Sequence, residues 1–103
     1  MPVSCFRVKV KPGSLEAVRE WARTIDARRE EALATLRDER VDVESVFLES
    51  APDGDFLIYY MRGHDLAASR VVAAASKHPI DEYHRDFLRR HVERGSALEL
   101  LVD

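Results

Sequence analysis

The chain lacks several features that would mark a particular class of protein. Cys5 is its only cysteine, so no disulfide can form within the chain, and a reducing compartment such as the cytoplasm is the default expectation. No apolar run approaches the roughly 20 residues that a membrane-spanning helix needs. The start, MPVSCFRVKVKPG, has no long apolar stretch after a basic one, so no signal peptide is expected. The sequence therefore predicts a cytoplasmic protein with no membrane partner.

Basic residues are not in excess either. The 103 residues include 16 Lys and Arg against 19 Asp and Glu, a formal net charge of -3, which argues against a nucleic-acid partner. A glycine-rich phosphate loop, a nucleophile elbow and a CxxC pair are all missing. With 46% apolar and 34% charged residues, the composition is ordinary for a soluble protein, and we expect residues 1–103 to form one domain.

Strand and helix patterns alternate along the chain. The predicted strands cover 3–10, 43–50, 55–62 and 97–102, and the predicted helices cover 14–40, 66–76 and 79–94. Asp53-Gly54 is a hairpin signal between the second and third strands, and Pro79 suits the first turn of a helix. This β-α-β-β-α-β order, with the second helical segment divided in two, is the ferredoxin-like split βαβ arrangement. Right-handed crossovers place four antiparallel strands in the order 4-1-3-2, an α+β fold with helices on one face.

The third predicted strand is apolar on both sides. Its side chains alternate between Phe56, Ile58 and Tyr60 on one face and Leu57, Tyr59 and Met61 on the other. A sheet with one face in water should alternate apolar and polar residues, so a second layer must cover the other face. A second copy of the chain is the simplest cover, which predicts a homodimer with its sheets packed face to face. The alternative is a monomer with an exposed apolar patch.

The length, the order of elements and the two-sided strand resemble the dimeric α+β barrel superfamily. That superfamily includes antibiotic-biosynthesis-type monooxygenases, haem-degrading enzymes, muconolactone-isomerase-like proteins and sugar mutarotases. The stretches ESVFLES, DGDFLIYYM and IDEYHRDFL are similar to an uncharacterised bacterial and archaeal family of about this length. The resemblance implies the fold and the dimer but no chemistry. The chain does not match the Asn/Trp/His set of the haem-degrading enzymes, because it has no Asn and Trp21 falls on the first helix.

One arginine falls among the apolar positions of the first predicted helix. Arg29 projects near the middle of the stripe formed by Leu15, Val18, Ala22, Ile25, Ala32 and Leu36. A guanidinium in a core is costly unless it is paired, so we expect Arg29 to be buried against a carboxylate. The candidate partners are Glu44, Glu49, Asp81 and Glu99. Arg29 is then either a binder of an anion or carbonyl or part of a structural ion pair.

The stretch SKHPIDEYHRDFLRRH holds three of the four histidines. His84 and His91 are two helical turns apart, roughly 10 Å, which is too far to share a metal ion. His78 and His84 have no recognised zinc spacing, so no metal or cofactor is expected. Asp81 lies one turn before His84 and can orient its imidazole for acid–base chemistry, which would raise the His84 pKa. The alternative is a core histidine satisfied by a carboxylate or a tyrosine.

These residues define a candidate site. Its predicted catalytic residues are His84, Asp81 and Tyr60, and its predicted substrate contacts are Arg29, Tyr59, Tyr83 and Glu49. The groups suit a cofactor-independent enzyme that acts on a small carbonyl, phenolic or acidic substrate through histidine acid–base chemistry. The alternative is a non-catalytic dimeric module that binds a small ligand or a protein partner. An enzyme should have Arg29 and His84 in one accessible cavity, whereas in a non-catalytic module they should lie in separate packed sites.

Overall fold

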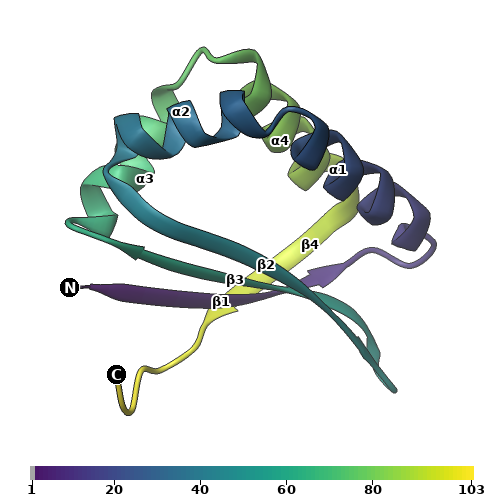
Figure 1. The fold of residues 1–103 in the computed structure, drawn as a ribbon. Coiled ribbons are helices and arrows are strands. Elements are labelled where there is room, and N and C mark those ends of the chain that lie inside the picture. The colour runs from purple at the N-terminus through teal and green to yellow at the C-terminus, as the bar shows by residue number, and fades with distance from the viewer. Residues whose placement is uncertain (1) are drawn as a thin grey trace.

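A computed structural model describes residues 2–103 as a four-stranded sheet with helices on one face (Figure 1). The elements are β1 (Val3–Val10), α1 (Leu15–Ala27), α2 (Arg29–Glu39), β2 (Val41–Ala51), β3 (Gly54–Gly63), α3 (Leu66–Ala75), α4 (Pro79–His91) and β4 (Val92–Ala97). The strands are antiparallel in the order β2-β3-β1-β4. The predicted ferredoxin-like α+β topology and strand order are therefore confirmed.

The β2–β3 hairpin sets which side chains face the helices. Ala51 pairs with Gly54 across the turn, and Gly54 has a φ of 137°, a conformation that glycine adopts without steric cost. The register then places Val46 opposite Tyr59 on the helix-covered side. Tyr60, next in the chain, points to the other side, because strand side chains alternate between faces.

Helices α3 and α4 begin where the sequence provides start signals. The Asp65 side chain accepts a hydrogen bond from the Ala68 N–H at 3.1 Å and so caps α3, and Pro79 occupies the first turn of α4. Apolar faces of α1 and α4 meet the sheet in a core formed by Val10, Val18, Trp21, Leu57 and Phe87. None of the helices in residues 2–103 has the length and apolar character to cross a membrane.

The long helix predicted over 14–40 is in fact two helices. Arg28, with φ -109° and ψ 34°, separates α1 from α2, although its N–H still bonds to the carbonyls of Thr24 and Ile25. The inward side nevertheless keeps its spacing across the break, because Ile25, Arg28 and Ala32 are half-buried and Thr35 and Glu39 are buried, so Arg28 rather than Arg29 falls on that side. The prediction that Arg29 is buried and paired with a carboxylate is wrong, because Arg29 is exposed and makes no ion pair within residues 2–103.

The last strand also differs from its prediction. β4 covers Val92–Ala97 rather than 97–102, and α4 ends at His91 rather than at residue 94. Pairing with β1 determines where α4 ends and β4 begins, since Val10 pairs with Val92 and the Lys11 N–H bonds to the His91 carbonyl at 2.8 Å. The apolar residues that suggested a strand follow β4 as an exposed tail, in which Leu101 is 81% exposed.

The face of the sheet opposite the helices has no covering layer in residues 2–103 (Figure 1). Cys5, Phe47, Ile58 and Tyr60 lie on this face, and Phe47 is 55% exposed. The tail after β4 leaves the sheet on the same side, where Asp103 bonds to Arg62 at 2.6 Å. A partly apolar face therefore remains open in one chain.

Candidate functional site

His84 lies in a packed aromatic cluster between α1, α4 and β3. The Trp21 indole Nε1–H donates a 3.1 Å hydrogen bond to His84 Nδ1, so the neutral imidazole carries its proton on Nε2. The His84 ring centroid lies 5.4 Å from that of Trp21 and 5.9 Å from that of Tyr59. Burial lowers the His84 pKa from 6.5 to about 4 and outweighs the opposing charge of Asp81. Burial and the Asp81 carboxylate shift the His84 pKa in opposite directions, and burial has the larger effect, so the imidazole is neutral at pH 7.

Two other polar side chains face the helix-covered side of the sheet near His84. The Tyr59 hydroxyl is buried and has no hydrogen-bond partner within residues 2–103, and burial followed by the charge of Glu44 raises its pKa. The Glu44 side chain reaches solvent at one edge, yet the surrounding protein and the charge of Asp81 raise its pKa. Burial therefore raises the pKa of both groups, and the Tyr59 hydroxyl is a donor without an acceptor within residues 2–103.

The other predicted site residues are divided between the two faces of the sheet. Glu49 forms a 2.8 Å ion pair with Arg7 on the open face, where the Tyr60 hydroxyl accepts a 3.1 Å hydrogen bond from Arg62. Tyr83 is half-buried and packs against the core on the helix side. Asp81, Tyr59, Tyr83 and His84 lie on the helix-covered side, whereas Arg29 is exposed at the start of α2 and neither Arg29 nor His84 lines the pocket described below.

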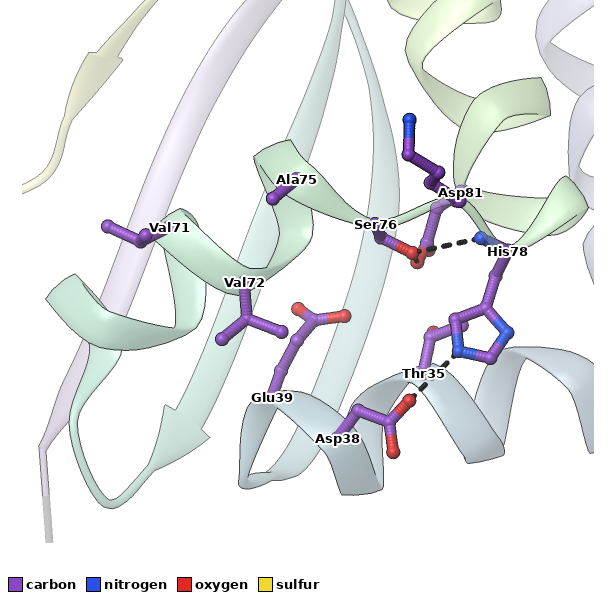
Figure 2. Close-up of a pocket in the computed structure, with 10 residues that line it drawn as sticks. Thr35, Asp38, Glu39, Val71, Val72, Ala75, Ser76, His78 and Asp81 are labelled. Atoms are coloured by element: carbon purple, nitrogen blue, oxygen red, sulfur yellow. Dashed lines mark hydrogen bonds and ion pairs between the residues drawn. The ribbon is translucent and has the colours of Figure 1, made fainter.

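A pocket of about 450 Å³ lies between α2, α3 and the start of α4 (Figure 2). Asp81 is the only predicted site residue that lines it. The Ser76 hydroxyl donates to the Asp81 carboxylate and accepts from the His78 N–H, and His78 Nε2 lies 2.9 Å from Asp38 Oδ2. The segment between α3 and α4 thereby holds Asp81 and the His78–Asp38 pair at one side of the pocket.

Glu39 reaches from the last turn of α2 into this pocket (Figure 2). The residue is only 8% exposed, and no hydrogen bond or ion pair reaches its carboxylate within residues 2–103. Burial, followed by the charges of Asp81, Glu44 and Asp38, raises the Glu39 pKa from 4.5 to about 7. A carboxyl with this pKa is partly protonated at neutral pH and can both donate and accept a proton.

Sequence reasoning missed Glu39 because the RDERVDVE stretch resembles a solvated helix end and turn. One signal was available, since Thr35, Asp38 and Glu39 are spaced to lie on one side of a helix. The Ser69 hydroxyl donates a 2.6 Å hydrogen bond to the Glu39 carbonyl, which ties the end of α2 to α3. In the described residues, no three His, Cys, Asp or Glu side chains form a metal-binding group.

The complete chain, residues 1–103, matches the family described as "Family of unknown function (DUF6176)". The chain belongs to this family. No curated protein matches the sequence. The resemblance predicted from ESVFLES, DGDFLIYYM and IDEYHRDFL, to a small family of unknown function within the α+β barrel fold, is confirmed.

Two solved structures share the fold of this DUF6176 protein. L-rhamnose mutarotase FA22100 from Formosa agariphila is 15% identical, with a TM-score of 0.69, and the match covers 100% of this chain and 98% of that chain. An antibiotic biosynthesis monooxygenase is 14% identical, with a TM-score of 0.59 and 99% coverage of both chains. At these identities the likeness is one of fold, and function depends on the residues of the site.

Proposed function

We propose that this DUF6176 protein binds a small polar molecule in the pocket between α2, α3 and α4 and acts on it as a cofactor-independent enzyme. The observation that carries the proposal is the Glu39 carboxyl, which belongs to a residue only 8% exposed, opens into the pocket and has no partner within residues 2–103. Such a carboxyl is free to form a hydrogen bond with a ligand or an ordered water molecule. Glu39 is the proposed proton donor and acceptor.

The pocket also restricts the class of substrate. Asp38, Glu39 and Asp81 line it together with Lys77 and with His78, which is paired with Asp38. Acidic groups outnumber basic ones there and oppose a carboxylate or phosphate ligand. Of the substrates expected from sequence, the acidic class is therefore disfavoured, and hydroxyl- or carbonyl-bearing molecules remain. The likeness to a protein named as a rhamnose mutarotase supports a non-anionic substrate of this kind. Asp81, positioned by Ser76, is the second carboxyl that could move a proton.

A second candidate is the predicted site at His84. The Tyr59 hydroxyl has no partner, and no hydrogen bond within residues 2–103 reaches His84 Nε2, so two donors on the helix-covered side stay unused. In the main proposal, Glu39 transfers the proton instead of His84. His84 then has a structural role between α1 and α4, as the hydrogen-bond acceptor of Trp21 in the core.

We also propose that two copies pair through their open sheet faces and that the dimer is cytoplasmic. The exposed Phe47 and the apolar tail that ends in Leu101 and Val102 lie on the side where the partner would pack. Burial of this surface would supply a favourable term at about 25 cal/mol per Å². The free thiol of Cys5 suits a reducing compartment.

A thermal-shift screen of small neutral, cationic and anionic compounds tests the proposed pocket. A ligand present at 100 times its dissociation constant should stabilise wild type by about 2.7 kcal/mol. The Glu39→Gln and Asp81→Asn variants should lose this stabilisation. Glu30→Gln is the matched control, because Glu30 is an exposed carboxylate on the same helix.

A ligand that stabilises wild type and Glu39→Gln equally would contradict the proposal. Measurement of the Glu39 pKa by carboxyl carbon NMR gives an independent check, since a value in the ordinary range near 4.3 would remove the proposed proton donor. Turnover of a ligand found in this way distinguishes an enzyme from the alternative, a non-catalytic binding module.

A further inference from the structure

We propose that the pocket accepts a primary aliphatic amine, with its ammonium group beside the Glu39 carboxylate and its hydrocarbon chain against Val72. The inference rests on the proposed function, because it names the ligand class for the same pocket. Figure 2 shows Glu39 of α2 and Val72 of α3 extending toward each other across this space.

The charges that surround Glu39 favour a cation. Glu39 faces Asp38 on its own helix, Asp81 on α4 and Glu44 on β2, while the connecting segment contributes Lys77 and His78. His78 is engaged by Asp38, and α3 presents only apolar side chains to the pocket. Three carboxylates thus act on Glu39, and two of them, Asp81 and Glu44, form no ion pair within residues 2–103. A cationic ligand would relieve this repulsion, as the proton held by Glu39 does.

The rest of the pocket favours an organic cation over a metal ion. Within the described residues, no three acidic, histidine or cysteine ligands converge as a metal site requires. The wall from α3 is apolar, and its two valines are unusually open to solvent, with Val71 69% and Val72 41% exposed. An ammonium group offers three donors to carboxylate oxygens, and an alkyl chain would cover these valines.

The ammonium group and the proton compete for the same carboxylate. Because the Glu39 pKa is about 7, the carboxyl changes from mostly protonated at pH 6 to mostly ionised at pH 8. A primary alkylamine stays protonated across this range. Amine affinity should therefore rise about 10-fold between pH 6 and pH 8, and the change should vanish when residue 39 cannot ionise.

Isothermal titration with butylamine, 1-butanol and butyrate tests the inference directly. At pH 8 wild type and Glu30→Gln should bind butylamine at least about 10-fold more tightly than either of the other compounds, and Glu39→Gln should lose about 10-fold in butylamine affinity. Val72→Thr keeps the shape of the side chain and should weaken butylamine by about 3-fold, because one apolar contact is lost. Urea denaturation of each variant verifies that it is folded.

The outcomes separate this inference from the proposed function. If 1-butanol binds as tightly as butylamine, if Glu39→Gln binds butylamine like wild type, or if butylamine does not bind, the amine inference is wrong. The proposed function survives each of these results if Glu39 titrates near pH 7 and another ligand depends on it. A Glu39 carboxyl that titrates near 4.5 overturns the proposed function as well, and butylamine affinity would then be the same at pH 6 and pH 8.

Discussion

Replacement of Glu39 by glutamine should change the pH dependence of stability, because the glutamine amide resembles a carboxyl that never ionises. In the folded wild type, Glu39 holds a proton up to a pKa of about 7, whereas in the unfolded chain it ionises near 4.5. The folded state therefore binds more protons between these values, and wild-type stability falls as pH rises through this window. The Glu39→Gln variant avoids that loss.

The size of the effect follows from the shift in pKa. A change from 4.5 to 7 corresponds to about 3 kcal/mol if the carboxyl were fully shielded from solvent. The Glu39 carboxyl faces an open pocket, so screening by water reduces the effect to about 1–2 kcal/mol. We expect the stability of Glu39→Gln relative to wild type to increase by most of this amount between pH 5 and pH 8.

The contribution of His84 to stability changes with pH in the opposite direction to that of Glu39. Its pKa of about 4 in the folded protein lies below its ordinary 6.5, so the unfolded chain binds more protons between these values. The stability that His84 contributes is present above pH 6.5 and is lost as pH falls through 4. In wild type, the pH dependence of stability caused by Glu39 opposes the one caused by His84 between about pH 5 and 6.5. Glu39→Gln should reveal the rise with pH that comes from His84.

Urea denaturation from pH 5 to pH 8, followed by circular dichroism, measures these differences. Protein concentration and ionic strength must be held constant, because a dimer gains stability with concentration and salt screens the carboxylates. Glu30→Gln should differ from wild type by a constant amount at every pH. If the difference between Glu39→Gln and wild type is also constant from pH 5 to pH 8, Glu39 ionises as an ordinary surface carboxyl and the reasoning fails.

Three further predictions concern the core, the end of β3 and the open face of the sheet. Tyr59→Phe removes a buried hydroxyl without a partner and should leave stability unchanged or raise it by up to about 1 kcal/mol in urea denaturation, whereas a loss of that size would reveal a bound partner. Gly63→Ala would bring a Cβ to 2.9 Å from the Arg40 carbonyl oxygen and should lower stability by about 1–3 kcal/mol; an unchanged midpoint would show that the backbone adapts. Light scattering should give twice the 11.8 kDa chain mass for wild type and the single-chain mass for Phe47→Glu, and a monomeric wild type would contradict the face-to-face dimer.

Local signals in the sequence were sufficient for the order of the elements. Asp53-Gly54 specifies the hairpin, Asp65 caps α3 and Pro79 starts α4, and each acts within a few residues of its own position. Given that order, the handedness of the crossovers leaves one arrangement of strands, and the structure has it. The topology could therefore be predicted without knowledge of any contact distant in sequence.

Contacts between residues distant in sequence determined the position of the last strand. The ALELLV segment has the stronger strand pattern, yet VERGSA forms β4, because Val92 and Gly95 meet the partners available on β1. Arg28, not Arg29, falls on the half-buried side of the first two helices, a difference of one position that the apolar stripe in the sequence did not resolve.

The candidate site depends on tertiary structure even more strongly. Glu39, Glu44 and Asp81 come from α2, β2 and α4, and the sequence does not show that they lie close together. Burial of Glu39, followed by the charges of the carboxylates around it, raises its pKa to about 7. His84 was recognised from sequence as an inward-facing residue, but the sign of its pKa shift depended on how completely Trp21, Tyr59 and Phe87 enclose it. Electrostatic effects depend on distance and on excluded water, and folding determines both quantities.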